Sequence, residues 1–174
     1  MSWNSANDLL KADNLLFYLV SGTTSAQTVE EAIVSGTCKV LAYATSVNIQ
    51  IDSESIDTSS KFSCKWGSNF AGRANYTISA DALYCQKASA DANGAVTFDH
   101  LMDLQVAGTP VGWVIGQEVD RGDTDCESFA HTLDKNKPYY YGKAAITSLS
   151  LSGGNNEIAS SSITLAGDGP IERK

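Results

Sequence analysis

The sequence has little positive charge. Twelve lysine and arginine residues stand against twenty aspartate and glutamate residues in 174, which gives a net charge of −8 at pH 7. Because proteins hold phosphate backbones with clustered cations, this balance argues against a nucleic-acid-binding protein, but not against one that lets nucleic acid pass without sticking. Charged residues make up only 18% of the chain, and serine and threonine fill much of the gap, as is typical of β-rich proteins. With 43% hydrophobic residues, the chain is expected to form one globular domain.

Long apolar runs and paired cysteines are also missing. No stretch is long and apolar enough to span a membrane, and the first residues lack the basic and apolar regions of a secretory signal. The four cysteines are widely spaced and include no C-x-x-C pair. A chain made in the cytoplasm with a full-size core needs no cross-links, so we expect four free thiols. They are Cys38, Cys64, Cys85 and Cys126.

Residues that carry enzymatic chemistry are scarce. There are two histidines, and the sequence contains no nucleophile elbow, phosphate loop, dinucleotide-binding glycine pattern or zinc-ligand spacing. The segment 118–137 does contain Asp120, Asp123 and Asp125, whose oxygens are of the kind that calcium binds. Without the glycine and spacing of an EF-hand, a solvated acidic loop is the preferred interpretation, and weak calcium binding there stays open. We predict no enzymatic activity, no cofactor and no metal site.

Alternation of apolar and polar residues predicts a mainly β fold. It is clearest at 47–55, where Val47, Ile49 and Ile51 are expected to face the core. The opposite, solvated face consists of Asn48, Gln50, Asp52 and Glu54. Further strands are predicted at 14–20, 38–45, 75–84, 111–115, 139–151 and 158–166, the last two joined by a Gly-Gly-Asn-Asn turn.

One helix is predicted, about three turns long. Thr97 is a suitable N-cap, Asp99 complements the helix dipole in the first turn, and Gly108 and Pro110 end the apolar pattern of helical spacing. The Ser-, Thr- and Gly-rich segment 21–36 is predicted to be an extended loop with at most a helical turn at 28–33. The order of elements predicts a β-sandwich or barrel with one flanking α-helix and extended loops.

Two segments are expected to extend from this single domain of residues 1–174. Residues 1–13 are predicted to form an N-terminal arm, and residues 56–73 an extended loop. The loop contains three aromatic residues four positions apart and three cations, which are Lys61, Phe62, Lys65, Trp66, Phe70 and Arg73. So many rings in one loop need a surface to bury them. That surface is either their own domain or a partner subunit, and the sequence does not decide between the two.

Three stretches together resemble the major tail protein, or tail-tube protein, family of long-tailed phages. The first runs from Leu41 to Lys61 and ends in Ile-Asp-Ser-Glu-Ser-Ile-Asp-Thr-Ser-Ser-Lys. The second joins Phe-Ala-Gly-Arg at 70–73 to the strand at 76–83. The third joins Thr-Phe-Asp-His-Leu-Met-Asp-Leu at 97–104 to the strand at 141–149. Their shared order and spacing extend the resemblance over residues 14–170.

The resemblance implies a structural virion protein whose rings, usually hexamers, stack into a hollow tube that conducts DNA from capsid to host cell. It implies no catalysis and no cofactor. The implied partners are further copies of the chain and the tail terminator, tape-measure and baseplate proteins, while viral DNA passes without specific binding and no membrane is contacted. The protein would be assembled in the host bacterial cytoplasm and reside in the virion tail.

On this basis two sets of residues receive hypothetical roles. Asn48, Gln50, Asp52 and Glu54 are assigned to the lumen, where an acidic, poorly basic surface would repel the phosphate backbone. Contact between rings is assigned to Lys61, Phe62, Lys65, Trp66, Phe70 and Arg73. The segments 21–36 and 118–137 are longer than in a minimal family member and are interpreted as decorations.

Two other functions fit the same sequence. A tube protein of a contractile injection or type VI secretion-like system would share this architecture, and the sequence does not separate a DNA conduit from an effector conduit. A carbohydrate-binding β-sandwich would use the three consecutive tyrosines at 139–141 as a stacking platform. We prefer a half-buried strand for these tyrosines, because alternation buries either the middle ring or its two neighbours.

Overall fold

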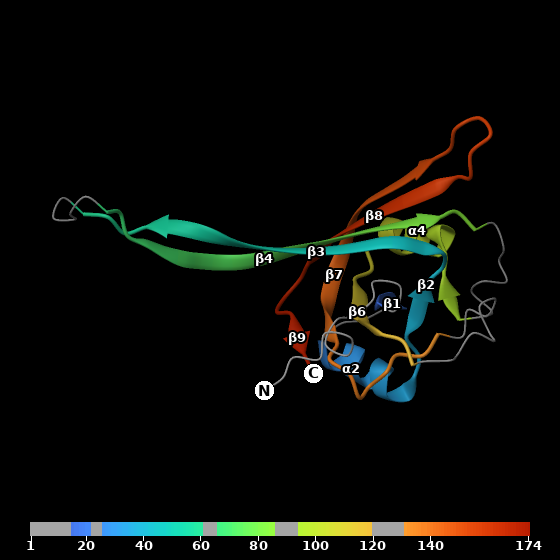
Figure 1. The fold of residues 1–174 in the computed structure, drawn as a ribbon, viewed down its shortest axis with the longest axis horizontal. Coiled ribbons are helices and arrows are strands. Elements are labelled where there is room, and N and C mark those ends of the chain that lie inside the picture. Colours follow the sequence, from blue (N-terminus) through green and yellow to red (C-terminus); the bar gives the residue numbers. More distant parts are fainter. Residues whose placement is uncertain (1–14, 22–25, 61–65, 86–93, 120–130) are drawn as a thin grey trace, which may run out of the picture.

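A computed structural model describes residues 15–21, 26–60, 66–85, 94–119 and 131–174, so the predicted arm at 1–13 lies outside the described residues. The elements are β1 (Leu15–Ser21), α2 (Ala26–Ser35), β2 (Lys39–Leu41), β3 (Ala44–Asp57), β4 (Asn69–Leu83), β5 (Ala95–Val96), α4 (Phe98–Val106), β6 (Val111–Gln117), β7 (Tyr140–Ser152), β8 (Ser160–Gly167) and β9 (Glu172–Arg173). The strands form one nine-stranded sheet in the order β3-β4-β8-β7-β6-β1-β2-β5, with β9 paired to β7 (Figure 1). The predicted mainly β class is therefore confirmed.

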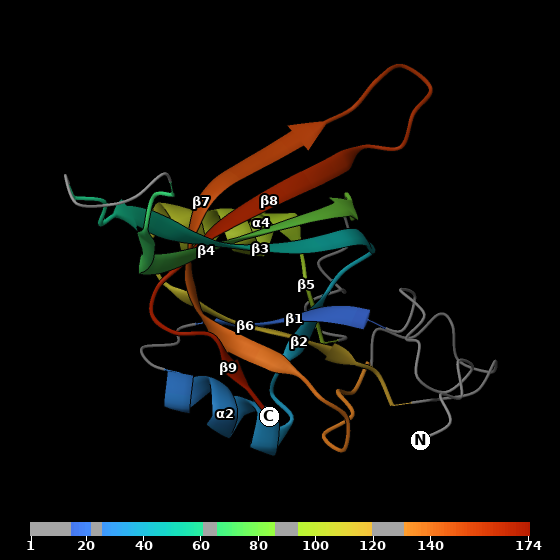
Figure 2. The same cartoon turned by 60° about the vertical axis from the view of Figure 1, so that its left-hand side comes forward.

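The sheet folds over on itself at β7. Residues 144–152 of β7 pair with β8, whereas residues 140–144 pair with β6. One end of β7 therefore belongs to an upper layer with β8, β4 and β3, and the other end to a lower layer with β6, β1 and β2 (Figure 2). The sandwich is thus built from one continuous sheet.

The main core lies between these two layers. Phe17 of β1 and Trp113 of β6 are fully buried from below, and Ile78 of β4 and Leu165 of β8 are buried from above. The alternation predicted for β4 is confirmed, because its apolar positions Tyr76, Ile78, Ala80 and Ala82 are all buried. Helix α4 also matches its predicted range and contributes the buried Leu101 to this core.

Helix α2 corrects the prediction of an extended loop over 21–36 and of a single flanking helix. Its buried residues Val29 and Ile33 pack with Tyr18 of β1 and Val114 of β6, so it covers the outer face of the lower layer. Threonine, valine and isoleucine lower the intrinsic helix propensity of this segment, but burial of one apolar face outweighs propensity. The described residues therefore contain two helices, on different layers.

The predicted strand at 38–45 is also interrupted. Strand β2 ends at Leu41 and β3 begins at Ala44, with the chain turning at Ala42 and Tyr43 between them. Tyr43 adopts a φ of 51°, in the left-handed region that ends regular strand geometry. The turn moves the chain from the lower layer to the upper one.

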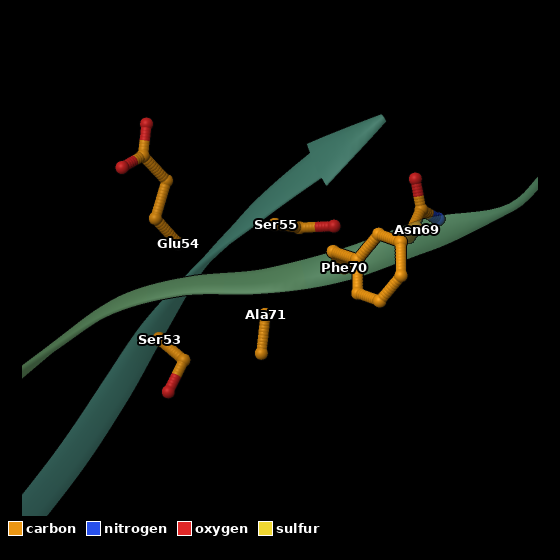
Figure 3. A pocket seen from close by; sticks show the side chains of 6 residues that line it. All are labelled: Ser53, Glu54, Ser55, Asn69, Phe70 and Ala71. Atoms are coloured by element: carbon orange, nitrogen blue, oxygen red, sulfur yellow. The ribbon is translucent and has the colours of Figure 1, made fainter. Parts of the chain in front are cut away.

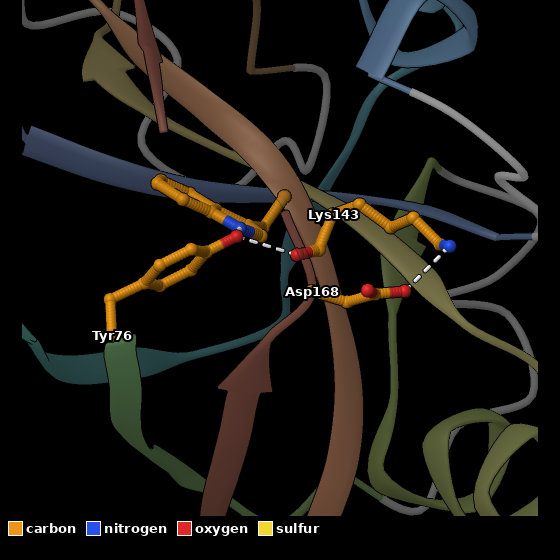
Figure 4. Close-up of polar contacts among 4 residues, drawn as sticks. Tyr76, Lys143 and Asp168 are labelled. Carbon is orange, nitrogen blue, oxygen red and sulfur yellow. Dashed lines mark hydrogen bonds and ion pairs between the residues drawn. The ribbon is translucent and has the colours of Figure 1, made fainter. Parts of the chain in front are cut away.

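A polar junction joins the layers where β7 passes between them (Figure 4). The Tyr76 hydroxyl donates a hydrogen bond to the Lys143 carbonyl at 2.5 Å and accepts one from the Trp113 indole N–H at 3.2 Å. The two rings meet edge to face with centroids 5.6 Å apart. The Lys143 ammonium pairs with Asp168 at 2.6 Å. Burial is the main cause that raises the pKa of Tyr76, so its hydroxyl stays protonated as a donor.

Replacing Gly167 with alanine is expected to lower the melting temperature by about 3–10 °C, because overpacking a core costs roughly 1–3 kcal/mol. A Cβ at this position would overlap the Tyr76 ring, which is held by its two hydrogen bonds and cannot turn away. Thermal unfolding followed by circular dichroism measures the change. Gly153→Ala is the matched control, since its Cβ would have no neighbour closer than 3.7 Å. Equal melting temperatures for the two variants would contradict a rigid junction.

Candidate assembly interfaces

The upper layer ends in two open edges. Strand β3 pairs with β4 along its length and, among the described residues, has no strand on its other side. Strand β7 pairs with β6 only as far as Ala144, so no described strand lies beside its residues 145–152 on the side away from β8. Residues 44–51 and 145–152 contain neither a charged residue nor a proline, the usual devices that keep an edge from pairing. Both edges are therefore suited to pair with another strand.

The strand directions at the two edges are complementary. The pairs β3–β4, β4–β8 and β8–β7 are all antiparallel, so β3 and β7 run in opposite directions. If β3 of a second copy lay beside β7, the two strands would be antiparallel and would continue the alternation of the layer. A single interface of this kind uses different surfaces on the two copies, which is the geometry that generates a ring when the rotation between copies closes.

The solvent-exposed face of the upper layer carries hydroxyl and amide side chains. By strand register, Asn48, Ser79, Thr164 and Ser148 form one row across the four strands. The adjacent row consists of Ser46, Asp81, Ser162 and Ser150. Asp81 is the one charged residue in these two rows. It accepts hydrogen bonds from Ser162 at 2.6 Å and Ser46 at 2.7 Å, which hold the pKa of its carboxyl below the ordinary value.

The structure divides the residues assigned to the lumen into two groups. Asn48, Gln50, Asp52 and Glu54 are all exposed. However, Ile51 is 61% exposed, although it was expected to face the core. Val47 and Ile49 do pack against the core. The prediction for Ile51 is wrong because β3 leaves the body at this point. Asn48 and Gln50 therefore lie on the body, while Asp52 and Glu54 lie on a projecting ribbon.

This two-stranded ribbon, of which the structure describes residues 51–60 and 66–75, is called the arm from here on and is distinct from the predicted N-terminal arm (Figure 1). The predicted loop at 56–73 is shorter than expected, because Ile56 pairs with Phe70, Asp57 pairs with Asn69, and only 58–68 connect the strands. The register shifts between Ser53 and Ser55. A hydrogen bond of 2.8 Å from the Thr58 N–H to the Ser68 carbonyl closes the ribbon.

Large apolar side chains on the arm are open to solvent. Trp66 is 82% exposed and Phe70 is 68% exposed, so these two rings do not pack onto their own domain. Arg73 is exposed on the same arm, whereas Lys61, Phe62 and Lys65 lie outside the described residues. An open pocket of about 210 Å³ lies beside Phe70, and Figure 3 shows the side chains that line it. It is lined by Ser53, Glu54, Ser55, Asn69, Phe70 and Ala71.

The candidate chemical groups do not converge on a site in the described part of the chain. No group of three His, Cys, Asp or Glu side chains there is placed to hold a metal ion, and Asp120, Asp123 and Asp125 lie outside it. Cys38 and Cys85 are free thiols, and burial raises the pKa of Cys38 to about 11, which keeps it in the poorly nucleophilic protonated form. The pairing state of Cys64 and Cys126 stays a prediction. No described helix has the length and apolar character to cross a bilayer.

Taken together, the exposed edges and arm define a structural protein whose surfaces are built for contact with other protein chains. The profile of the phage tail tube protein family matches residues 18–173. The chain belongs to this family and is a structural tube subunit. The comparison with curated proteins finds no match.

Solved structures share the fold at low sequence identity. The tail of an empty gene transfer agent particle with C6 symmetry aligns with a TM-score of 0.63 and 18% identity, covering 94% of this chain and 98% of the other. The SPP1 tail tube aligns with a TM-score of 0.61 and 10% sequence identity, covering 95% of this chain and 78% of the other. A chain of the 6-fold symmetrised anti-feeding prophage baseplate aligns with a TM-score of 0.58 and 7% sequence identity, covering 97% of both chains.

Proposed function

We propose that this chain forms six-membered rings that stack into the hollow tail tube through which viral DNA passes from capsid to host cell. The observation that carries the proposal is the pair of uncharged, oppositely directed open edges on one four-stranded layer. Pairing of β7 with β3 of the next copy would close a continuous sheet around a lumen and satisfy the backbone groups of both edges. The six-fold symmetry described for the gene transfer agent tail supports six copies.

The hydroxyl and amide face of the upper layer is proposed to line the lumen. Its rows contain Asn48 from the set predicted from sequence, together with side chains of β4, β8 and β7, and Gln50 lies next to them on β3, opposite Thr77. Asp81 would place one carboxylate per subunit on this surface. A lumen of neutral polar groups with a small negative charge would let a phosphate backbone pass without binding it.

The arm is proposed to make the contact between stacked rings. Trp66, Phe70 and Arg73 are exposed there, and Lys61, Phe62 and Lys65 belong to the same segment of sequence. Buried aromatic anchors surrounded by paired charges are the usual composition of strong contacts. Terminator, tape-measure and baseplate proteins would then be needed only at the ends and in the lumen of the tube. Such a subunit would be assembled in the host cytoplasm, reside in the virion tail and carry no enzymatic activity.

Negative-stain microscopy of the purified protein, together with light scattering, tests the proposal. Closed rings with a central hole, and stacked tubes at high concentration, are the expected result. Monomer at high concentration without any ring on the grid would contradict it. Dilute monomer alone would not, because assembly of a ring depends on concentration.

A tube of a contractile injection system is the second candidate. Its support is the shared fold with a chain of the anti-feeding prophage baseplate. The genes adjacent to this one distinguish the two, since capsid and portal genes would indicate a DNA conduit and effector genes a protein conduit.

Asn48→Lys combined with Gln50→Lys is expected to slow DNA release strongly without preventing tube formation. Both side chains are exposed on the body, so folding is preserved, but every subunit would add two cations that attract the phosphate backbone. The release rate from purified virions and the plaque titre measure the effect. Asn48→Asp combined with Gln50→Glu is the control and should release DNA at the normal rate. Normal release by the lysine variant would contradict the lumen assignment.

A further inference from the structure

Helix α4 carries a continuous stripe of apolar and acidic side chains on its outer face. Asp99, Met102, Asp103 and Val106 follow the spacing i, i+3, i+4 and i+7, which places them side by side on a helix. Met102 is 45% exposed and Val106 is 86% exposed, while Leu101 on the opposite side is buried in the core. The stripe therefore has no cover within the described part of the subunit.

The negative charge of this stripe is not balanced within the helix. Phe98–Val106 contains no lysine or arginine. The Asp99 carboxylate, 3.4 Å from the Tyr84 hydroxyl, is the main cause that raises the pKa of that tyrosine. The stripe thus combines exposed apolar area with negative charge.

Val34 and Tyr140 are also exposed, but each lies beside a basic side chain. The Lys135 ammonium donates a hydrogen bond of 3.0 Å to the carbonyl of Val34, and the Arg173 guanidinium lies 6.0 Å from the ring centre of Tyr140. A partner that presents apolar side chains together with positive charge would be attracted to the acidic stripe of α4. It would be repelled by the basic side chains beside Val34 and Tyr140.

The arm has the complementary character. Trp66 and Phe70 supply exposed rings, and Arg73 supplies a cation that forms no ion pair with any described residue. Figure 1 shows the arm reaching away from the body on one side, while α4 lies toward the other side, beyond β7. An arm therefore does not reach α4 of its own chain. A contact between the arm of one copy and α4 of another is head-to-tail, so it can repeat indefinitely.

We propose that the arm of one subunit docks on the α4 stripe of a second copy of this chain. Trp66 and Phe70 pack against Met102 and Val106, and Arg73 pairs with the carboxylates of Asp99 and Asp103. This inference rests on the proposed stacking role of the arm and adds the surface that receives it.

A photo-cross-linker tests the contact directly. Phe70→benzoylphenylalanine keeps an aromatic ring on the arm and leaves Trp66 in place. After irradiation of assembled tubes, mass spectrometry is expected to find the cross-link on peptides containing residues 98–107 of another copy. Cross-links confined to α2, to the β7–β8 hairpin or to another arm would overturn the docking proposal.

Charge reversal provides an independent test. Asp103→Arg and Arg73→Asp are each expected to shorten the median tube several-fold, and the double variant is expected to restore it. Glu31→Arg, the same reversal of charge at an exposed position of α2, is the matched control and should leave tube length unchanged. Val106→Asp should shorten tubes as Asp103→Arg does, while the melting temperature of the subunit stays normal, since the side chain is exposed.

The failures of the two proposals can be told apart. Tubes of normal length from Asp103→Arg and Val106→Asp would overturn docking on α4 and leave the tube function standing. A double variant no longer than the single variants would overturn the pairing of Arg73 with the stripe. Absence of both rings and tubes from the unsubstituted chain at high concentration would overturn the tube function itself.

Discussion

Trp66→Ala is expected to abolish ring stacking while leaving the melting temperature of the subunit unchanged. The ring is 82% exposed in the single chain, so removing it costs the subunit no core contact. If the arm joins rings, each ring-to-ring joint buries one such anchor per subunit, and the loss of an aromatic anchor typically costs about 2 kcal/mol or more. Because every subunit of a ring would lose the same contact, the loss at each joint is multiplied by the number of subunits. Tube length by electron microscopy and thermal unfolding of the same preparation measure the two effects.

Two control variants distinguish a specific stacking contact from non-specific hydrophobic association. Val34→Ala removes a similarly exposed apolar side chain, 68% exposed on α2, and should leave tube length normal. Trp66→Phe should retain most of the stacking, since a ring remains. A fall in melting temperature with tubes of unchanged length would assign Trp66 to the fold of the subunit and remove its stacking role.

Ring closure is expected to protect the backbone amides of the two open edges from hydrogen exchange. In the monomer, amides of residues 44–51 and 145–152 that point away from β4 and β8 have no strand partner among the described residues. In a closed ring they would enter a ladder, and their exchange should slow by about two orders of magnitude or more. Successive amides of a strand point to opposite sides, so the change should affect alternate residues. Exchange mass spectrometry or NMR on monomer and assembled tube measures it.

The interior strand β8 is the internal control. It is paired on both sides, with β4 and β7, so its amides are already protected in the monomer and should change little. Tubes in which β3 and β7 exchange as fast as in the monomer would show that rings close through side chains alone. In that case the lumen is not lined by a continuous sheet.

The sequence predicted the elements whose patterns come from burial on one side. The alternation at Tyr76–Ala82, the turn between β7 and β8, and the limits of α4 were all correct, because local pattern and tertiary environment agree there. Helix α2 was missed because its stability comes from the packing of Val29 and Ile33. The Ser- and Thr-rich composition of the segment does not predict that packing.

The candidate surfaces were only partly predictable. Alternation at 47–51 indicated which side chains share a face, but the point where β3 leaves the body is set by the length of the strands packed beneath it, so the exposure of Ile51 could not be predicted. The hydroxyl rows across β4, β8 and β7 depend on strand order and register, which no single strand encodes. A signal was nevertheless present, because serine alternates with leucine at 148–151. The exposed face of α4 could not be predicted from the sequence, because the spacing of Met102 is compatible with a place in the core as well as with an exposed one.

If arms join the stacked rings, they also determine where a tube of such subunits would bend. A two-stranded ribbon with solvent on both faces is far softer than a sheet packed on a core, and it is barely stable by itself. In such a tube the rings would stay rigid, and curvature of the tail would be confined to the flexible joints between them. The bore of each ring would keep its shape while the whole filament flexes, so a bent tail would still offer the genome an unobstructed path.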